Sequence, residues 1–386
     1  MAIEAEPTAA LEAKNGLRIL HVVTRSHRRG AEVFALELAL ASDALGDHNE
    51  VVAITRATDG GETAGLPPLV PTNRLGIRAF IQGTWSLHRL LKHDPADVVL
   101  AHGGWAAIVV AATGSSTSTV RIWQRILGLP LEQWGRTRLA IWAMIARRFD
   151  GVVALTPDME MEMRELGYAG PVWAIGNARE PGRFAAVDRT VAAATLRQQI
   201  GISEDLPLLG FVGHLVDQKH PEMAVDVLAE VHRQGQPAHL VMAGDGPRWT
   251  AVLARIKAHG LEDSVTLLGH RDDPETIFGG VNLVLITSRA EGIPGVAIEA
   301  QMTGCPVLTF RLGAIEDVVE DGVTGVIVPR GDSLAMASAA VELMRDRDRL
   351  HAMSLAATPR VSGFTTAITA TLYASRYHEL RSARRR

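Results

Sequence analysis

The sequence predicts an α/β protein with two Rossmann-like domains that face each other across a cleft, each built on a parallel β-sheet. Three observations support this prediction. The chain has 386 residues, which is long enough for two domains. Short apolar runs that fit buried strands alternate with stretches that fit helices, and this alternation occurs twice. Glycine-containing turns follow several of the apolar runs, where open α/β sheets place their ligands.

The composition excludes several classes of protein. Hydrophobic residues make up 47% of the chain and aromatic residues 5%, as expected for a folded α/β protein. The formal net charge of −4 gives no general attraction for nucleic acid. A single cysteine, Cys305, excludes a disulfide framework and favours a reducing, cytoplasmic compartment. No apolar run reaches the roughly 18 residues of a membrane span, and residues 1–16 lack the apolar core of a secretory signal, so we expect a flexible tail there.

The first half contains a candidate anion site. Buried strands are expected at residues 17–23, 50–55, 96–102 and 150–156. A loop rich in arginine at 24–30 separates the first strand from a helix expected at 31–40. A basic loop at a helix N-terminus attracts anions, which makes Gly30 a candidate phosphate contact, although a glycine needed only for the turn would look the same.

Two further features of the first half allow more than one interpretation. His102 ends a predicted strand, where ligands bind in open α/β sheets, but single histidines more often have a structural role. Residues 136–148 form an apolar stretch with arginines at both ends, which fits a helix lying on a membrane surface. Because this stretch is apolar nearly all round, a buried helix is the favoured interpretation.

The stretch from Ser288 to Ala300 organises the second half. It follows an apolar run at 281–286, and it reads as a loop and then a helix, with Pro294 at the first helical position. Glu291 lies in the loop, and Glu299 lies about a turn and a half into the helix. Backbone N–H groups at the helix N-terminus attract anions between the two carboxylates. An arrangement that binds hydroxyls, then phosphate, then hydroxyls fits a nucleotide sugar.

The motifs of this second half resemble a known family. The run from Glu291 to Ala300, followed by Gly304-Cys-Pro-Val-Leu308, resembles the signature of the GT-B glycosyltransferases of family 4, which are retaining enzymes that use nucleotide sugars. The resemblance covers most of residues 17–375. It implies a GT-B fold, in which the last helix folds back onto the first domain.

The resemblance implies roles for individual residues. Gly213 and Lys219 match a turn that binds the donor diphosphate, whereas His214 stands where the family has arginine. In the first half Gly30 matches and Arg29 replaces a glycine, while His102 matches a histidine near the donor sugar. The other donor-binding residues that the resemblance implies are His270, Arg271, Glu291, Gly292, Ile293, Pro294, Gly295 and Glu299.

The expected domain boundaries combine these motifs with the glycine and proline content. We expect an N-terminal domain at 17–180, completed by residues 364–380, and a nucleotide-sugar domain at 181–363. The linker is placed within 178–206, which contains Pro181 and Gly182. A basic tail is expected at 381–386.

The predicted function is retaining transfer of a hexose from a nucleoside diphosphate sugar to an acceptor hydroxyl. His102, Lys219 and Glu291 are the predicted catalytic residues, and UDP is the expected nucleotide because it is common in the family. The acceptor class stays open among a glycan, a lipid-linked sugar and a small metabolite, and peripheral membrane contact fits the second of these. No cofactor or metal is expected, because Lys219 and helix N-termini supply positive charge. The Asp-x-Asp pattern at 346–348 lies among arginines and reads as a solvated helix face.

Three other functions remain open. A nucleotide-sugar epimerase or hydrolase would use the same fold and release free nucleotide without an acceptor. A non-catalytic sugar-nucleotide-binding subunit would bind donor without turnover. An NAD oxidoreductase fits poorly, because the turn at 244–249 lacks the third glycine of the dinucleotide fingerprint.

Overall fold

The chain forms two compact units, each organised around one parallel sheet. The computed structural model describes residues 16–26, 30–57, 66–114, 118–128, 131 and 134–384. The N-terminal unit runs to Ala178 and takes up the chain again from Thr366. The C-terminal unit consists of Arg179–Thr365. Residues 1–15 of the expected tail at 1–16, residues 27–29 of the basic loop at 24–30, and the last two residues lie outside the described residues.

Seven parallel strands form the sheet of the N-terminal unit, in the order β3-β2-β1-β4-β5-β6-β7. Their apolar, largely β-branched runs are buried, as parallel sheets require. The strands are β1 (Arg18–Arg25), β2 (His48–Thr55), β3 (Pro68–Val70), β4 (Val98–His102), β5 (Val120–Gln124), β6 (Gly151–Ala154) and β7 (Val172–Ala174).

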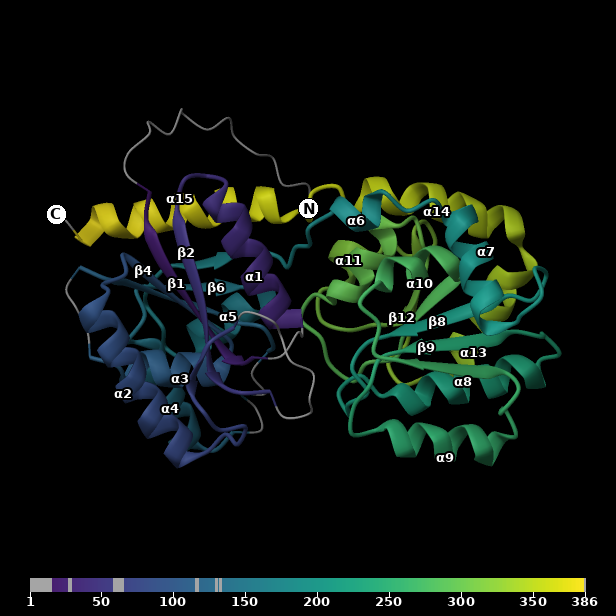
Figure 1. Ribbon diagram of the computed structural model, residues 1–386, viewed down its shortest axis with the longest axis horizontal. Coiled ribbons are helices and arrows are strands. Elements are labelled where there is room, and N and C mark those ends of the chain that lie inside the picture. Colours follow the sequence, from purple (N-terminus) through teal and green to yellow (C-terminus); the bar gives the residue numbers. More distant parts are fainter. Residues whose placement is uncertain are drawn as a thin grey trace. The chain divides into compact units, whose positions relative to one another are not determined.

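Helices cover both faces of this sheet (Figure 1). One face carries α1 (Gly30–Asp43) and α15 (Thr366–Arg384), which pack against each other. The other face carries α2 (Ile77–His93), α3 (Gly104–Ala112) and α4 (Arg136–Ala146), with α3 in contact with both neighbours. A further helix, α5 (Pro157–Glu165), joins β6 to β7.

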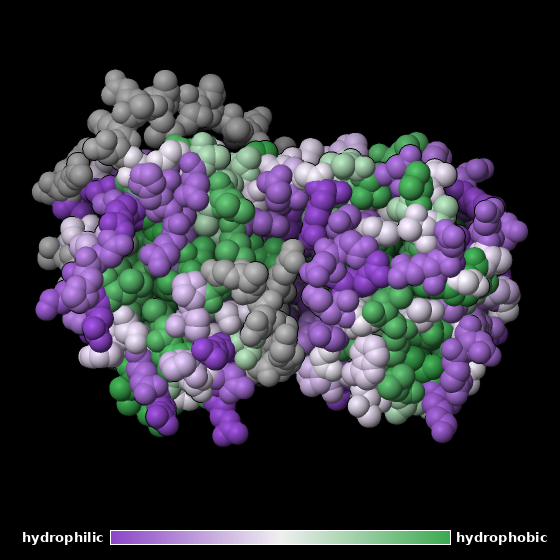
Figure 2. Space-filling model, in the orientation of Figure 1, coloured by the Kyte–Doolittle hydropathy of each residue, from purple (hydrophilic) through white to green (hydrophobic). Residues whose placement is uncertain are grey.

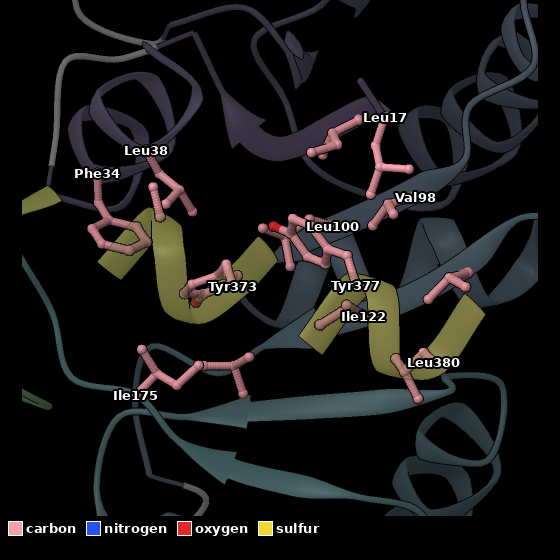
Figure 3. Close-up of a cluster of buried hydrophobic side chains, with 14 of the residues drawn as sticks. Leu17, Phe34, Leu38, Val98, Leu100, Ile122, Ile175, Tyr373, Tyr377 and Leu380 are labelled. Atoms are coloured by element: carbon pink, nitrogen blue, oxygen red, sulfur yellow. The ribbon is translucent and has the colours of Figure 1, made fainter. Parts of the chain in front are cut away.

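The last helix belongs to the core of the N-terminal unit. Tyr373, Tyr377 and Leu380 of α15 pack with Phe34 and Leu38 of α1 in one buried cluster (Figure 3). The prediction that the C-terminal helix folds back onto the first domain is therefore confirmed. This segment supplies apolar surface that covers one face of the sheet.

Two expectations for the N-terminal unit differ from the structure. The helix expected to be buried at 136–148 lies at the surface, and only Ile145 and Ala146 of α4 are buried. Helix α3 packs on β1 and β4, whereas the main contact of α4 is with α3, so α4 covers little of the sheet. Residues 381–384 are helical instead of forming a tail, since Arg381 pairs with Asp97 and Arg384 with Asp150.

Six parallel strands form the sheet of the C-terminal unit, in the order β10-β9-β8-β11-β12-β13. They are β8 (Leu208–Val212), β9 (His239–Ala243), β10 (Val265–Gly269), β11 (Leu283–Ile286), β12 (Val307–Phe310) and β13 (Gly325–Val328). The two sheets confirm the predicted pair of Rossmann-like folds.

The helices of the C-terminal unit again lie on both faces of the sheet (Figure 1). They are α6 (Gly182–Ala185), α7 (Arg189–Ile200), α8 (Pro221–Arg233), α9 (Trp249–His259), α10 (Pro274–Gly280), α11 (Gly295–Met302), α12 (Ile315–Val318), α13 (Ser333–Arg345) and α14 (Arg347–Arg360). The region expected to be a linker contains α6 and α7, and α7 packs on α10. Asp346 of the Asp-x-Asp pattern caps α14, because its side chain accepts from the backbone N–H of Arg349 at 2.9 Å. Among the described helices, none is both long and apolar enough to cross a membrane.

Candidate functional site

The candidate site of the C-terminal unit lies where its strand order reverses. From β8 the chain proceeds outward to β9 and β10, and then returns to the other side of β8 as β11. The loops that follow β8 and β11 therefore diverge from neighbouring strand ends. Such a switch point is where open α/β sheets bind ligands. The first loop contains Gly213, His214 and Lys219, and the second contains Glu291.

Hydrogen bonds fix these two loops to each other. The Thr287 hydroxyl donates to the carbonyl oxygens of Lys219 and His220, at 3.1 and 3.0 Å. The backbone N–H of Arg289 donates to the carbonyl oxygen of Gln218 at 2.7 Å. The Gln218 side-chain amide donates in turn to the carbonyl of Ala290 at 2.9 Å. The strand ends thus hold the Lys219 turn in one geometry.

Lys219 and Glu291 form an ion pair within this frame. Nζ of Lys219 lies 2.5 Å from Oε1 of Glu291, and the same oxygen accepts from the Ser288 hydroxyl at 2.6 Å. The Glu291 side chain is only 8% exposed, while that of Lys219 is 25% exposed. Gly313 lies against this loop, because a Cβ there would come within 2.4 Å of the Glu291 carbonyl oxygen. The two charged groups are therefore held together, with the lysine more accessible to a ligand.

Glu299 has a partner that the sequence did not reveal. Nε of Arg179 lies 2.5 Å from Oε1 of Glu299, and the two side chains are 4% and 15% exposed. The guanidinium also lies directly against the start of α11, since a Cβ on Gly295 would fall 1.6 Å from Nη2 of Arg179. Gly295 therefore makes room for the arginine beside the helix N-terminus. The charge at this end of α11 includes a buried guanidinium as well as backbone N–H groups.

Pro294 is the N-cap of α11, whereas the sequence predicted it at the first helical position. Its ψ of 117° is extended, so the helix begins one residue later, at Gly295. The loop before it, which contains Gly292 and Ile293, is tied to the following segment through the Gly292 carbonyl, which accepts from the N–H of Ala314 at 3.3 Å. The helix N-terminus, where the sequence predicts an anion site, therefore lies at Gly295, one residue later than expected.

The glycine turn after β8 places His214 beside an acidic residue. Gly213 has a φ of 154°, at the edge of the region that side chains rarely adopt, and the backbone of Gly244 packs on its carbonyl. Nδ1 of His214 lies 3.4 Å from Oδ1 of Asp245, a half-exposed carboxylate. His220, the residue after Lys219, adopts a left-handed φ of 48° at the N-cap of α8. Strain of this kind in a non-glycine residue is concentrated at functional sites.

The loop that contains His270 and Arg271, two of the predicted donor-binding residues, is stabilised by its own charges. The guanidinium of Arg271 donates two hydrogen bonds to Asp273, each of 2.7 Å. The hydrogen bond from Arg271 lowers the pKa of Asp273, and the Coulombic attraction of the same guanidinium acts in that direction too. His270 is more than half exposed and lies 3.5 Å from Asp272. The Arg271 side chain therefore stabilises the loop, and His270 is the more solvent-exposed of the two residues.

The N-terminal unit has its own switch point, between β1 and β4. Gly30 is the first residue of α1 and is exposed, at the end of the loop after β1. His102 is the last residue of β4 and is almost fully buried. Gly30 comes after β1 and His102 ends β4, and these two strands are neighbours in the sheet.

His102 belongs to a buried chain of polar side chains that crosses the sheet. Its Nε2 lies 3.0 Å from Nδ1 of His21 on β1, and its Nδ1 contacts Oε1 of Gln124 on β5. On the far side, Nε2 of His21 lies 2.9 Å from Oδ1 of Asn49 on β2, and the Asn49 amide donates to Asp43 at 2.9 Å. Both ring nitrogens of His102 are therefore occupied by protein partners.

Burial keeps both histidines of this chain neutral near pH 7. Desolvation lowers the pKa of His21 to about 4, although the hydrogen bond to Asn49 opposes the shift. Desolvation also lowers the pKa of His102 well below its usual value, and His21 adds to this effect. Neutral imidazoles can donate through one nitrogen and accept through the other, so the chain depends on their tautomers.

Sequence reasoning missed four residues that hold the candidate site together. Arg179 and Ser288 bond to the two glutamates, Asp245 lies beside His214, and His21 bonds to His102. Only His21 carried a usable indication, as a polar residue within an otherwise apolar strand. The other three lie in loops or at the head of the second unit, where no periodic pattern predicts a contact.

A cavity of about 310 Å³ in the C-terminal unit lies away from these residues. Pro207, Asn282 and Pro306 line it, and each of them directly precedes a strand. The cavity therefore opens at the amino ends of β8, β11 and β12, opposite the edge that carries Lys219 and Glu291.

Comparison with protein families gives two matches along the chain. Residues 206–346 match the family described as glycosyl transferases group 1. Residues 29–178 match the glycosyl transferase 4-like domain. Together the two matches cover most of both units.

Several known proteins align with part of this chain. Alpha-D-kanosaminyltransferase from Streptomyces kanamyceticus is 32% identical over 180 residues, 46% of this chain and 46% of its own length. D-inositol 3-phosphate glycosyltransferase from Nocardia farcinica is 33% identical over 188 residues, 46% of this chain and 41% of its own. The 2-deoxystreptamine glucosyltransferase from S. kanamyceticus is 27% identical over 317 residues, 77% of this chain and 80% of its own. The first two alignments thus span less than half of each relative.

Solved structures with the same fold cover nearly the whole chain. HepE from Anabaena, crystallised with UDP-glucose, has a TM-score of 0.77 at 21% identity and covers 94% of this chain and 100% of its own. Sucrose-phosphate synthase from Thermosynechococcus elongatus has a TM-score of 0.78 at 20% identity and covers 95% and 100%. At this level of identity the likeness establishes the fold.

Proposed function

This chain belongs to the group 1 glycosyl transferase family and has the GT-B fold, and on that premise we propose that it transfers a hexose from a nucleoside diphosphate sugar to an acceptor hydroxyl with retention of anomeric configuration. The observation that carries the proposal is the set of charges at the switch point of the C-terminal sheet. Lys219 and Glu291 meet there in one rigid frame. Glu299 lies on the adjacent helix α11, about one turn after its first residue, Gly295.

Each of these groups suits one part of a nucleotide sugar. Glu299 accepts hydrogen bonds from the ribose hydroxyls, and Glu291 accepts hydrogen bonds from sugar hydroxyls. Lys219, 25% exposed, offers its ammonium to the diphosphate by exchanging one carboxylate oxygen for a phosphate oxygen. Gly213, where an added Cβ would meet nothing within 4 Å, allows the backbone to approach the phosphates closely, and Gly292 to Gly295 lead into the N-terminus of α11, which is assigned to the same phosphates.

The proposed chemical step breaks one bond and forms another on the same face of the sugar. The bond between the anomeric carbon and the diphosphate oxygen breaks, and its electron pair leaves with the phosphate. The acceptor oxygen forms the new bond to the anomeric carbon, and its proton passes to the departing phosphate oxygen. The charge that develops on the diphosphate is what Lys219 and the positive end of α11 stabilise. The direct route follows from the family resemblance, and the sequence offers no convincing nucleophile for a covalent glycosyl–enzyme intermediate.

The roles assigned to the N-terminal unit are proposals of the same kind. Gly30 is exposed at the start of α1 and is assigned to the phosphates. His102 is assigned to the donor sugar. Because both its ring nitrogens are hydrogen-bonded to protein side chains, the contact would be made by the backbone at the end of β4 or by a ring nitrogen that exchanges its protein partner for the sugar. His270 and Arg271 are assigned to the nucleobase, with the Arg271 guanidinium already engaged by Asp273. His214 is assigned to the diphosphate.

UDP is the proposed nucleotide. HepE, which shares the fold, was crystallised with UDP-glucose, and one relative is a glucosyltransferase. Transfer is proposed to be independent of metal ions, because Lys219, Arg179 and the start of α11 place positive charge where the phosphates would bind. A peripheral contact of residues 136–148 with a membrane is also proposed, since Ile141 and Met144 of α4 are exposed.

The test is a donor screen followed by turnover. UDP-, GDP- and ADP-sugars are compared by thermal shift on the purified chain, because a ligand that binds only the folded state raises its melting temperature. The stabilising donor is then incubated with panels of sugars, lipid-linked sugars and cyclitols, with and without EDTA. Formation of an α-linked product in EDTA supports the proposal. Loss of activity in EDTA that Mg²⁺ restores contradicts the metal-independent form.

The remaining alternatives give different products in the same assay. Nucleoside diphosphate and free or isomerised sugar without acceptor would indicate an epimerase or hydrolase. Stabilisation by donor with no turnover on any acceptor would indicate a binding subunit. Lys219, Glu291 and Glu299 together favour the transferase, because a subunit that only binds nucleotide has no need of a carboxylate reserved for sugar hydroxyls.

A further inference from the structure

Helix α2 has two apolar stripes on opposite sides, and only one of them packs against the protein. Ala79, Gly83 and Leu87 are buried, four residues apart along the helix. Gly83 marks how close this packing is, because a Cβ there would lie 3.2 Å from Ile54 of β2. This stripe accounts for the contact of α2 with the sheet and with α3.

The second stripe consists of Ile77, Ile81 and Trp85, which also recur every four residues. Their side chains are 80%, 59% and 59% exposed. Each precedes a residue of the buried stripe by two positions, which is about 200° around the helix axis. The second stripe therefore points directly away from the core. A row of three large apolar side chains on a solvent-facing helix marks a site of interaction.

The charges around this stripe have one sign. Helix α2 contains the basic residues Arg78, Arg89 and Lys92, together with His88 and His93, and no aspartate or glutamate. These five side chains are exposed. Arg89 continues the apolar row and places its guanidinium over the Trp85 ring, 4.7 Å from the ring centre. The helix thus has its apolar row and one arginine, Arg78, in its first half and is cationic toward its end.

The neighbouring helix on the same sheet face has a similar composition. Helix α4 exposes Ile141 and Met144, has arginines at 136 and 138, is followed by arginines at 147 and 148, and contains no acidic residue. Both helices contact α3 between them. Around α2, at the lower left of Figure 2, apolar side chains reach the surface among hydrophilic ones. Asp94, the residue that follows α2, is paired with Arg18.

We propose that the outer face of α2, formed by Ile77, Ile81, Trp85, Arg78, Arg89 and Lys92, docks onto an anionic phospholipid surface. The apolar row enters the boundary between headgroups and acyl chains, Trp85 lies at that boundary, and the basic side chains reach lipid phosphates. The charge pattern selects this partner, because a protein interface core is depleted in charge whereas an anionic membrane attracts a cluster of lysine and arginine. The proposal does not depend on glycosyl transfer, because lipid binding is measured without donor or acceptor.

The experiment is flotation of the full chain with lipid vesicles. Mixed phosphatidylglycerol–phosphatidylcholine vesicles should bind the chain, and pure phosphatidylcholine vesicles should bind it at least about tenfold more weakly, because each basic residue near the surface contributes about fivefold. Binding should fall as NaCl rises, since screening shortens the range of the attraction. Quenching by lipids brominated on the acyl chain should report Trp85, and the quenching should drop in W85F.

Two matched pairs of variants test whether α2 is the surface involved. I77S/I81S should lose binding about tenfold or more, whereas V191S/L355S, which removes two exposed aliphatic side chains of the C-terminal unit, should not change it. R78Q/R89Q/K92Q should weaken binding to anionic vesicles, whereas K257Q/R330Q/R349Q should have little effect. Thermal unfolding and UDP binding serve as folding controls for all four variants.

Several outcomes would overturn the proposal. The chain could fail to float with anionic vesicles at low salt. The α2 variants and their controls could lose binding equally, which would remove α2 from the interaction. Light scattering could show a dimer that I77S/I81S dissociates, which would make this face a contact between copies of the chain.

Discussion

Arg179 and Glu299 form an almost completely buried ion pair at the start of α11, with Nε of the arginine 2.5 Å from Oε1 of the glutamate. The pair joins the first residue of the C-terminal unit to the helix that carries the proposed ribose contact. Glu299 is therefore oriented before any nucleotide binds. One carboxylate oxygen is committed to Arg179, which leaves the other for a ribose hydroxyl.

The first prediction concerns Arg179. Arg179→Ala leaves a buried carboxylate without its partner, so the C-terminal unit should lose about 3–5 kcal/mol of stability and UDP should bind at least about tenfold more weakly. Arg179→Lys should recover part of the stability and less of the affinity, because an ammonium cannot reproduce the planar guanidinium contact. Calorimetric UDP titration and urea unfolding measure the two effects.

Gly295→Ala is an independent variant for the same pair. Its Cβ would fall 1.6 Å from Nη2 of Arg179, so the guanidinium must move although both charged residues remain. The affinity for UDP should fall in this variant too. Arg311→Ala, which removes a more exposed arginine paired with Glu316, is the control and should leave UDP binding unchanged. Wild-type affinity in Gly295→Ala would show that the position of Arg179 is irrelevant to the nucleotide.

The second prediction separates the two glutamates. Glu299→Ala should weaken the binding of free UDP by about 1.5–3 kcal/mol, the range for hydrogen bonds to a charged group. Glu291→Ala should leave the affinity for free UDP nearly unchanged and lower turnover, because Glu291 is assigned to the sugar. Isothermal titration with UDP and with the intact donor distinguishes them. An equal loss of UDP affinity in both variants would refute the division of roles.

The sequence predicted the strands and loops that carry the candidate site, because these elements follow from local patterns of apolar residues, glycine and proline. The apolar run at 281–286 predicted a buried strand, and the structure places β11 there, beside β8. Lys219 and Glu291 follow these strands at short distances, so the parallel sheet alone brings their loops to one edge. The turn and helix chemistry around Gly213 and Gly295 was equally local.

The partners of the site residues could not be predicted in this way. Arg179 and Glu299 are 120 residues apart, and the arginine lies in a segment that resembled a linker. The exposed position of α4 was also missed, because hydropathy along a helix does not reveal that α3 packs on the sheet and that α4 packs on α3. Pairing between distant polar residues depends on how whole helices and strands are positioned relative to one another. Composition and local patterns do not predict that positioning.

The third prediction concerns His214, which lies 3.4 Å from Asp245. A neighbouring carboxylate favours the imidazolium form, and an imidazolium is what a diphosphate requires. Turnover at saturating donor should therefore decline on the alkaline side of neutrality. His214→Arg should keep activity and flatten this decline, since the guanidinium stays charged. His214→Ala should lower the rate and also flatten the profile. Three superimposable pH profiles would contradict the role of His214 and would assign the diphosphate charge to Lys219.

The fourth prediction is that His21 and His102 make the N-terminal unit sensitive to acid. The pKa of His21 is lowered from 6.5 to about 4 in the folded state, so between these values the unfolded chain binds more protons. Stability is fully present above pH 6.5 and is lost as pH falls toward 4, by about 3 kcal/mol for His21. His102 shifts in the same direction and adds to the loss.

Urea unfolding of the N-terminal unit at a series of pH values measures this loss. His21→Gln should reduce the slope of stability against pH in this range, although its stability at neutral pH should be lower. His48→Gln, which replaces an exposed histidine on β2, is the control and should keep the wild-type slope. A slope that is unchanged in His21→Gln would assign the acid sensitivity to the carboxylates of the unit.

The last prediction follows from counting protons along the same chain of side chains. The Asn49 amide donates to Asp43, so its oxygen faces His21, and Nε2 of His21 must donate to it. Nδ1 of His21 then accepts from Nε2 of His102, and a neutral His102 has no proton left on Nδ1. An oxygen of Gln124 opposite that nitrogen would require a third proton on the two rings, which burial opposes.

We therefore expect the Gln124 side chain to present its NH₂ group to His102, with both histidines as Nε2–H tautomers at neutral pH. Nitrogen-15 chemical shifts of the two imidazoles report this directly, because protonated and unprotonated ring nitrogens resonate far apart. Gln124→Glu should place an acceptor carboxylate against Nδ1 of His102, draw the third proton onto the rings, and move His102 from the neutral to the imidazolium pattern. Gln124→Met removes the amide with little change in volume and should leave both rings neutral. An imidazolium in the wild type at neutral pH would show that the two imidazole rings carry three protons between them and that burial does not keep this pair of histidines neutral.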